Sequence, residues 1–355
     1  MTTIAALSDL HLGAPGSYLT IESIRTKLLN SLWLNTQGRI DKLLLVGDII
    51  DLTVGRTPGP WVEARKFFAQ IFAPGLDIGH IIYIPGNHDH HLWVMLVEYE
   101  EIVKKLDALR TPEVPSTSTV FQGVRYDHHT PLHNLFPETV RDRVTFAYPF
   151  YVLPEKTGKV RLLFHHGHYF DRKITPLAGF ASSFYNLMDV EAINSPYIEG
   201  LFYLWTGHRV LQNLELSCYR TFKRLRFVPR SFLPRRPHFP VASSRYTLGR
   251  CPIRRIKKLL SRLEYLSSQV PEKDIWVFGH THRADGPKPK QAGGWLQMFD
   301  LGGWVLNSDP LHSGDTEWST PAIFYWNDAR GAWLDEISLD LKEKGSVTKY
   351  LDQSC

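Results

Sequence analysis

Short, mostly apolar runs recur along this chain, and five of them end immediately before a polar cluster. These runs occupy residues 4–7, 42–46, 80–84, 160–164 and 275–278. Apolar runs of this length, followed by glycine or polar residues, are typical of buried strands. The pattern therefore predicts five strands whose carboxyl ends all carry polar side chains.

Longer segments between the predicted strands carry apolar residues at the three- and four-residue spacing of helices. They are residues 21–34, 61–72 and 91–109, and the last adds two Glu–Lys pairs four residues apart, which support a helix. Strands alternating with helices indicate a layered α/β fold. In such folds ligand sites lie beyond the carboxyl ends of the strands, which is where the five polar clusters fall.

After the fifth cluster the alternation gives way to strand patterns alone. Residues 295–300, 304–307, 322–326 and 332–339 look like strands separated by Gly-rich or Asn-Asp turns. Short turns of this kind predict antiparallel hairpins.

Residues 172–258 interrupt the alternation with aromatic-rich helical stretches and a Pro/Arg-rich segment. They contain 16 Lys and Arg against four acidic residues, a balance of +12, whereas the rest of the chain carries −7. We interpret them as a mainly helical insertion, or cap, set into a catalytic domain formed by residues 1–171 and 259–355. Such a concentration of positive charge predicts an anionic partner or surface.

Length and composition limit the class of protein. With 355 residues and 43% hydrophobic content, the chain can bury one large core with an appended subdomain. Its three cysteines lack a disulfide or metal-site spacing, which favours a reducing compartment. We find neither a signal peptide nor the roughly 18 uncharged apolar residues of a spanning helix. We therefore expect a cytoplasmic protein, which could also lie peripherally at the inner face of a membrane.

The five polar clusters offer carboxylate, amide and imidazole groups in a fixed order along the chain. These oxygen and nitrogen ligands suit a pair of borderline divalent metals, and two metals about 3.5–4 Å apart recur in enzymes that attack phosphate esters. One such cluster alone has little weight, but chance agreement at all five is negligible. The clusters are Asp9-Leu10-His11, Gly47-Asp48-Ile49-Ile50-Asp51, Gly86-Asn87-His88-Asp89, His165-His166-Gly167-His168 and Gly279-His280-Thr281-His282.

The spacing within the clusters indicates which side chains bind metal. Asp9 and His11 are two residues apart at a strand end, so their side chains point the same way and can bind one metal together. Asp48 follows a glycine that leaves room for the backbone turn, so it can approach closely enough to bridge two metals. The remaining candidate ligands are the neutral oxygen of Asn87 and the nitrogens of His166, His280 and His282.

One histidine of the third cluster is left for proton transfer. His88 has no assigned metal and would suit a proton donor to the leaving oxygen, with Asp89 orienting its ring. More typical of solvated or structural positions are His90, His91, His128, His129 and His133.

The ordered set resembles the calcineurin-like metallophosphoesterase superfamily, whose pattern is DxH, GDxxD, GNHD/E, a histidine before glycine, and GHTH. The resemblance covers residues 4–171 and 275–307 and implies a four-layer α/β/β/α sandwich with two facing sheets. It implies two divalent metal ions, with Mn²⁺ preferred over Fe, Zn or Ni. His165 competes with His166 as a ligand, and the adjacent glycine favours His166. Carried over, one metal would be held by Asp9, His11, Asp48 and His282, and the other by Asp48, Asn87, His166 and His280.

Within that superfamily the layout is similar to the UDP-2,3-diacylglucosamine pyrophosphatases of bacterial lipid A synthesis. Those enzymes share the DLHL start, an HGD-like fourth motif and a helical, basic insertion before a GHTHR motif. Arg283 and His168 are the candidate substrate-binding residues here. Two positions depart from that subfamily, because His88 replaces an arginine and His168 replaces an acidic residue.

The sequence thus predicts a hydrolase that cleaves a phosphodiester or pyrophosphate bond by metal-activated hydroxide. A lipid-linked or nucleotide-sugar substrate is favoured, since the insertion combines aromatic residues that suit acyl chains with basic ones that suit phosphates or an anionic membrane. A metal-dependent nuclease or nucleotide phosphodiesterase is the enzymatic alternative. It is less favoured because the aromatics come early and the charges late in the insertion.

Two further alternatives stay open. The insertion could be a helical hairpin that packs on the body and carries ordinary solvated charges. The whole chain could also be a non-catalytic scaffold of the same fold.

Overall fold

The computed structural model describes thirteen stretches of the 355-residue chain. It describes residues 2–14, 16–53, 59–72, 75–108, 110, 125–126, 129–154, 160–168, 195–200 with 202–203, 273–286, 296–307 and 317–354. The insertion predicted for residues 172–258 lies outside the described residues except for 195–200 and 202–203, which are helical. The prediction of a separate cap is therefore untested.

The larger sheet has seven strands in the order β14-β13-β1-β2-β3-β5-β4. Its centre is parallel from β1 through β5, and β13, β14 and β4 are added antiparallel at its edges. The strands are β1 (Thr3–Leu7), β2 (Arg39–Val46), β3 (Asp77–Ile84), β4 (Arg125–Tyr126), β5 (Val144–Ala147), β13 (Ala322–Asn327) and β14 (Gly331–Glu336).

The second sheet has five strands in the order β6-β7-β8-β10-β9. Strands β7, β8 and β10 run parallel, with β6 and β9 antiparallel at the edges. They are β6 (Phe150–Pro154), β7 (Val160–His165), β8 (Lys273–Phe278), β9 (Ala284–Asp285) and β10 (Leu296–Leu301), and a separate pair is formed by β11 (Leu306–Asn307) and β12 (Glu317–Trp318).

Alternate residues of the central strands are buried on opposite faces. On β2, Leu44 and Val46 belong to the apolar cluster shared with the five-stranded sheet, whereas Leu43 and Leu45 belong to the cluster shared with the helices. All four are fully buried. Burial on both faces explains why these strands read as continuous apolar runs in the sequence.

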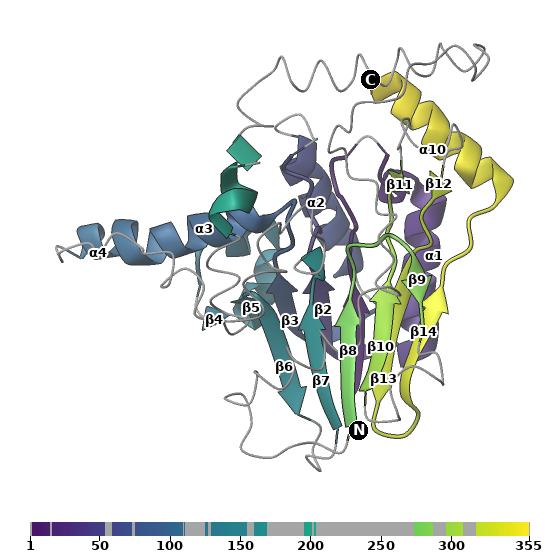
Figure 1. Cartoon of the computed structure of the whole chain (residues 1–355), viewed down its shortest axis with the longest axis horizontal. Helices are drawn as coiled ribbons and strands as arrows, with labels where there is room; N and C mark the ends of the chain where they lie inside the picture. The colour runs from purple at the N-terminus through teal and green to yellow at the C-terminus, as the bar shows by residue number, and fades with distance from the viewer. Residues whose placement is uncertain are drawn as a thin grey trace, which may run out of the picture.

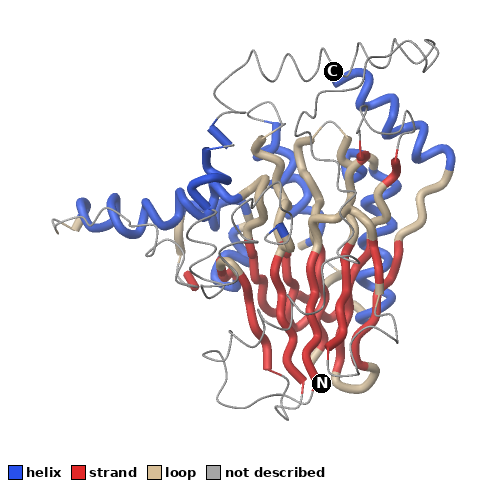
Figure 2. The backbone as a smooth tube through the Cα atoms, in the orientation of Figure 1, coloured by secondary structure: helices blue, strands red, loops and turns tan. Residues whose placement is uncertain are grey.

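Helices cover the outer face of the seven-stranded sheet. Helix α1 (Glu22–Thr36) buries Ile24, Leu28 and Leu32 at four-residue intervals, as an amphipathic helix requires. Figures 1 and 2 show α1 and α2 (Gly59–Ile71) behind the strands, with α10 (Leu341–Ser354) near the C-terminus. The short helices are η1 (Tyr18–Thr20), η3 (Pro131–Leu135) and η4 (Glu138–Arg143).

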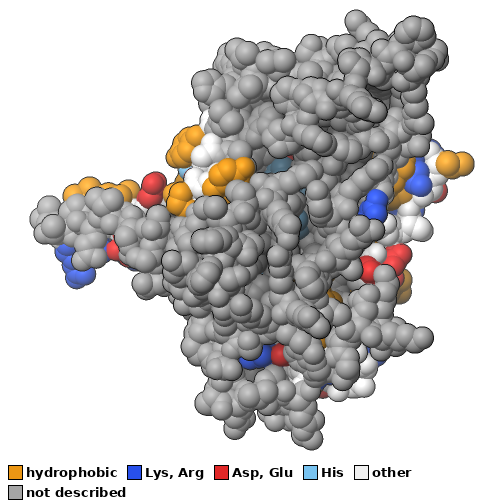
Figure 3. All heavy atoms as spheres, viewed as in Figure 1, with side chains coloured by type: hydrophobic (Ala, Val, Ile, Leu, Met, Phe, Trp, Pro, Cys, Tyr) orange, Lys and Arg blue, Asp and Glu red, His pale blue; other side chains and the backbone are white. Residues whose placement is uncertain are grey.

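The predicted helix 91–109 forms an arm of three joined pieces. Helix α3 (His90–Glu98) continues through the π-helical turn η2 (Tyr99–Val103) into α4 (Lys104–Asp107), and Figure 1 shows the arm projecting from the body. Both predicted Glu–Lys pairs are present, at 3.0 and 2.5 Å. Figure 3 shows hydrophobic side chains along the arm, where Met95, Val103 and Leu106 are exposed.

The α/β class with two facing sheets is confirmed. One part of the prediction was wrong, because β10 does not form an antiparallel hairpin with the strand that follows it but lies between β8, to which it is parallel, and β9, to which it is antiparallel. Among the described strands that follow residue 295, β13 and β14 form the expected antiparallel hairpin, and β11 pairs antiparallel with β12. In the part of the chain that the structure places, no helix is long and apolar enough to cross a membrane.

Candidate metal centre

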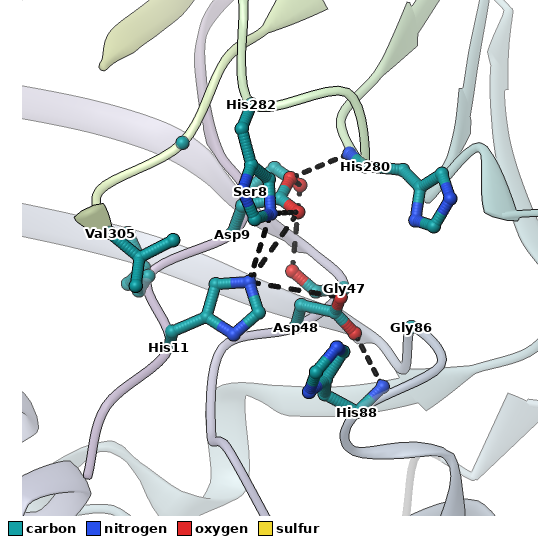
Figure 4. Close-up of polar contacts among 12 residues, drawn as sticks. Ser8, Asp9, His11, Gly47, Asp48, Gly86, His88, His280, His282 and Val305 are labelled. Carbon is teal, nitrogen blue, oxygen red and sulfur yellow. Dashed lines mark hydrogen bonds and ion pairs between the residues drawn. The ribbon is translucent and has the colours of Figure 1, made fainter. Parts of the chain in front are cut away.

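The polar clusters come together at one end of the two sheets. Asp9 and His11 follow β1, Asp48 follows β2, and Asn87 follows β3, all on the larger sheet. His166 follows β7, and His280 and His282 follow β8 on the smaller sheet. Figure 4 shows the loops that carry Asp9, Asp48 and His88, from the larger sheet, converging with the loop after β8 on a single centre. The centre therefore straddles the interface between the sheets.

Asp9, His11 and His282 form a first group with the geometry of a metal site. The Nε2 atoms of His11 and His282 lie 3.1 Å apart, and His282 Nε2 lies 3.3 Å from Oδ1 of Asp9. The other carboxylate oxygen of Asp9 accepts hydrogen bonds from the Ser8 hydroxyl at 2.5 Å and from the backbone N–H of His280 at 2.8 Å. Oδ1 is thereby aimed at the two rings.

Asp48, His166 and His280 form a second group. His166 Nε2 lies 3.0 Å from Asp48 Oδ2 and 3.2 Å from the amide oxygen of Asn87. The opposite ring nitrogen of His166 donates to the carbonyl of Val46 at 3.0 Å, which leaves Nε2 to face the group. The structure thus brings Asn87 to the side of the centre where the sequence predicts it.

Asp48 lies between the two groups. Its Oδ2 is also 3.9 Å from His11 Nε2, and it forms a third possible ligand set with His11 and His88. Burial raises the pKa of the Asp48 carboxyl, but the neighbouring His166 and His88 outweigh burial and hold the pKa well below its usual range. A charged carboxylate between two groups of imidazoles is the arrangement expected of a bridging ligand.

The backbone at this centre is strained. Among the residues that the structure describes, six non-glycine residues have positive φ, and all but Gln37 belong to the predicted ligand set. Such conformations cost about 1–3 kcal/mol each for ordinary side chains and persist where the surroundings impose them. The five are Asp9 (52°), His11 (45°), Asp48 (52°), His280 (73°) and His282 (58°).

Two glycines are required by close approach of side chains from other loops. A Cβ at Gly47 would lie 2.4 Å from Cγ of His166, and one at Gly279 would lie 2.0 Å from Oδ2 of Asp9. Each glycine that precedes a ligand therefore makes room for a ligand from a different cluster. The spacing of the motifs reflects packing between loops as well as local turns.

His88 lies at the edge of the centre with its ring partly exposed. Its Nδ1 lies 2.7 Å from the hydroxyl of Thr53 and 3.2 Å from Oδ2 of Asp51. Burial lowers the pKa of His88, but the charges of Asp51 and Asp48 prevail and raise the pKa to about 10. The neighbouring carboxylates therefore favour the protonated form of the ring.

The prediction that Asp89 orients the His88 ring was wrong. The Asp89 carboxylate accepts hydrogen bonds from the backbone N–H groups of Asp48, Ile49 and Gly86 at 3.2, 2.9 and 2.6 Å, and from the hydroxyl of Tyr83 at 2.6 Å. It is fully buried. Asp89 therefore holds the loops after β2 and β3 together.

Asp51 takes the orienting role that sequence reasoning gave to Asp89. Its Oδ2 lies 2.9 Å from Nδ1 of His11 and 3.2 Å from Nδ1 of His88, so one carboxylate contacts both rings. The signal was present in the second motif, whose last residue is Asp51. Its partners could not be read from spacing, because they lie 40 and 37 residues away in sequence.

The remaining site residues occupy distinct positions. His165 lies on β7 and accepts a hydrogen bond from the N–H of Gly167 at 2.9 Å, while His166 faces the centre. His168 is buried with its ring 5.5 Å from that of His166. Arg283 is partly buried beside the fifth motif, and its backbone N–H donates to Thr281 at 3.2 Å. Substrate contacts by His168 and Arg283 stay predictions.

The donor set fits divalent cations. Asp9 Oδ1 is buried and accepts no hydrogen bond from the part of the chain that the structure describes, although two imidazole nitrogens face it. Burial lowers the pKa of His166, yet the charges of Asp48 and Asp9 raise it to about 9. The surrounding carboxylates thus favour positive charge at this point. Oxygen and imidazole donors suit Mn, Fe, Zn or Ni.

A family comparison agrees with this geometry. The model of the calcineurin-like phosphoesterases matches residues 2–284, a span that includes all five motifs. The chain therefore belongs to the calcineurin-like phosphoesterase family, a class that depends on dinuclear metal sites. None of the curated proteins matches the sequence significantly.

Solved structures with distant likeness include three proteins, each covering nearly all of both chains. A dimetal phosphatase from Danio rerio has 13% identity, a TM-score of 0.38 and coverage of 94% of this chain and 95% of its own. Vps29 from Chaetomium thermophilum has 10% identity, a TM-score of 0.33 and coverage of 95% of this chain and 97% of its own. GAP50, the anchor in the inner membrane complex of Plasmodium, has 10% identity, a TM-score of 0.38 and coverage of 99% of this chain and 94% of its own.

Proposed function

We propose that this protein hydrolyses a phosphodiester or pyrophosphate bond at the centre built around Asp48. The observation that carries the proposal is the position of Asp48, whose carboxylate is shared by ligand sets on both sides of the centre. Membership of the phosphoesterase family supports the reaction class. The carboxylate and imidazole groups around Asp48 support a dinuclear site.

The candidate ligands divide between two cation positions. Asp9, His11, Asp48 and His282 would hold one cation, and Asp48, Asn87, His166 and His280 would hold the other. When bound, two divalent cations would orient phosphate oxygens, acidify a water and offset the charge that develops in the transition state. Mn²⁺ is our preferred ion, with Fe, Zn and Ni as the alternatives.

His88 would supply the proton that the leaving oxygen needs. Asp51 and Thr53 contact its Nδ1, so Nε2 is the nitrogen left to serve a substrate. The centroid of the His88 ring lies 4.8 Å from that of His11, a candidate ligand of the first cation, which supports this role for His88. A positioned proton donor of this kind contributes about 10²–10⁴ in rate.

For the substrate we favour a lipid-linked or nucleotide-sugar phosphodiester or pyrophosphate, as in the UDP-2,3-diacylglucosamine pyrophosphatases. The support is the basic and aromatic sequence between residues 172 and 258, whose charge suits phosphates or an anionic membrane face in the cytoplasm. A nuclease is the alternative. Turnover of a lipid-linked pyrophosphate, with none of single-stranded nucleic acid, would decide between them.

The reaction class is tested with Mn²⁺ and a nitrophenyl phosphodiester. We expect metal-dependent turnover that Asp48→Ala abolishes and that Asp142→Ala, a change at an exposed aspartate on η4, leaves intact. Turnover that is independent of added metal, or equal in the Asp48→Ala variant, would contradict the proposal.

A non-catalytic scaffold is the alternative of another class. Elemental analysis after reconstitution with Mn²⁺ separates the two, because the enzyme should retain about two ions per chain and a scaffold none. Loss of both ions in Asp48→Ala, with retention in Asp142→Ala, would locate them at the centre.

A further inference from the structure

A short helical segment contacts the start of α3 through hydrogen bonds and ring stacking. It comprises residues 195–200 and 202–203, the part of the 172–258 region that the structure describes. Figure 1 shows it as the short teal helix beside the base of the arm. Its contacts go to His90 and His91, the two residues that follow the third metal motif. Sequence reasoning treated these two histidines as solvated or structural.

Glu199 contacts both histidines at once. Its Oε1 lies 2.5 Å from Nδ1 of His90, and its Oε2 lies 2.9 Å from Nδ1 of His91. Ser195 lies on the other side of His90, with its hydroxyl 2.6 Å from Nε2. The His91 ring also stacks on Phe202 at 4.2 Å, with 16° between the planes. We call these five residues the clamp.

Two other interpretations of the clamp fail on geometry. Ser195, His90 and Glu199 have the order of contacts of a catalytic triad, but Ser195 is fully buried and His90 is 1% exposed, so a substrate could not reach the hydroxyl. His90, His91 and Glu199 also do not meet the distances of a metal site, unlike the three groups at the centre. Each histidine instead has its own carboxylate oxygen. The contacts serve to hold one segment on another.

The clamp acts on a stretch of chain that leads directly into the metal centre. Helix α3 begins at His90, immediately after Asp89, and Asp89 is bonded to the backbone of the loops that carry Asp48 and Asn87. His90 is further packed against Tyr148, at 5.2 Å between ring centroids. The direction in which the loop 86–89 leaves the centre is thus fixed by the first turn of α3.

We propose that Glu199 is a positioning residue for the loop 86–89, acting through His90 and His91 to hold Asn87 and His88 at the metal centre. This inference rests on the proposed function for its effect on catalysis, but its effect on metal affinity does not require turnover. Residues behind metal ligands commonly change metal affinity or activity by 10- to 100-fold. Glu199 contacts the ligand-bearing loop only through His90 and His91, so we expect a smaller change, about three- to tenfold, in metal affinity.

The experiment compares the full chain with Glu199→Gln, Glu199→Asp and the matched control Glu101→Gln. Glu101 lies in η2 on the arm and pairs with Lys105 at 2.5 Å, away from the loop 86–89. Mn²⁺ binding is measured by titration calorimetry, and kcat and KM are measured with the nitrophenyl phosphodiester. Thermal unfolding without metal reports on stability.

For Glu199→Gln we expect the weaker of two Mn²⁺ sites to lose about three- to tenfold in affinity, with kcat reduced and KM nearly unchanged. Glu199→Asp, which keeps the charge, should recover part of both losses, and Glu101→Gln should lose neither. Equal Mn²⁺ affinity in the wild type and Glu199→Gln would overturn the inference. So would a lower melting temperature with no change in affinity or kcat, since that is a purely structural role. Absence of turnover in the wild type would contradict the proposed function, and the Mn²⁺ titrations would still decide on the clamp.

Discussion

The strands of the two sheets and the loops at their carboxyl ends differ in polarity and in backbone conformation, although only a few residues separate them. Leu43 to Val46 on β2 are apolar, fully buried and regularly paired. Two residues later Asp48 has positive φ and a buried charge. The comparison shows that the strained and charged loops depend on rigid, apolar strands beneath them. The loops supply the candidate ligands and the proton donor, and the strands supply the rigid scaffold that positions them.

The most severe test of this division is Gly47→Val, at the junction of strand and loop. The new side chain would overlap His166, whose Cγ lies 2.4 Å from the Cβ position, and φ is +80°. We expect activity to fall roughly 10⁴-fold, about 5 kcal/mol in the transition state, with Mn²⁺ binding weakened. Metal titration and kcat/KM measure this. The control is Gly345→Ala on α10, where open space surrounds the glycine. A Gly47→Val enzyme with normal metal content would contradict the packing argument.

A second loop change, His88→Asn, should remove the proton donor and keep the fold. We expect kcat to fall about a thousandfold with an alkyl leaving group and much less with nitrophenolate, which needs no proton. Measuring kcat with the two leaving groups provides the check. An equal loss for both would mean that His88 acts on the metals or on substrate binding.

The strand side of the comparison is tested by Leu44→Ala between the two sheets. Leu44 is fully buried in the cluster that joins the sheets, so its truncation should cost about 3 kcal/mol of the free energy of unfolding. Urea unfolding measures the loss. Activity per folded molecule should stay within about twofold of wild type, since the loops keep their backbone contacts. A much larger fall in activity at full folding would show that strand packing also tunes the site.

The smallest expected effect is the pH dependence of the stability that Glu199 contributes. Burial raises the pKa of this carboxyl, but hydrogen bonds from His90 and His91 prevail and lower it from 4.5 to about 2. A carboxyl whose pKa is lower in the folded state contributes stability above its unfolded pKa, and this contribution is lost as the pH falls from 4.5 towards 2. We expect Glu199→Gln to be less stable than wild type by about 2 kcal/mol at pH 7, with the difference shrinking below pH 4. Unfolding of both proteins at pH 7, 4 and 3 measures it. A constant difference would assign the effect to packing.

Most of the strands could be predicted because they are buried on both faces. The apolar run that ends at Val46 leaves no helical alternative between Lys42 and Gly47. The pairing of β10 with β8 could not be predicted, because local alternation is the same in parallel and antiparallel strands. The π-helical turn at Tyr99–Val103 leaves no mark in the spacing either.

At the centre, the predicted ligands could be placed because each is marked by a motif at the end of a strand. The roles of Asp51 and Asp89 could not be read from sequence, since both carboxylates find partners in other loops. Asp51 and His88 are 37 residues apart and meet only through the pairing of β2 with β3. The clamp was still harder to predict, because His90 and Glu199 are 109 residues apart in sequence.

Asp89 belongs to none of the three possible ligand sets, yet it joins the backbones that present Asp48 and Asn87. The two loops cannot drift apart without breaking its hydrogen bonds. The carboxylate therefore works as a fixed spacer, and a lengthening by a single methylene, as in Asp89→Glu, would alter the gap between the two halves of the centre while leaving every ligand in the sequence intact.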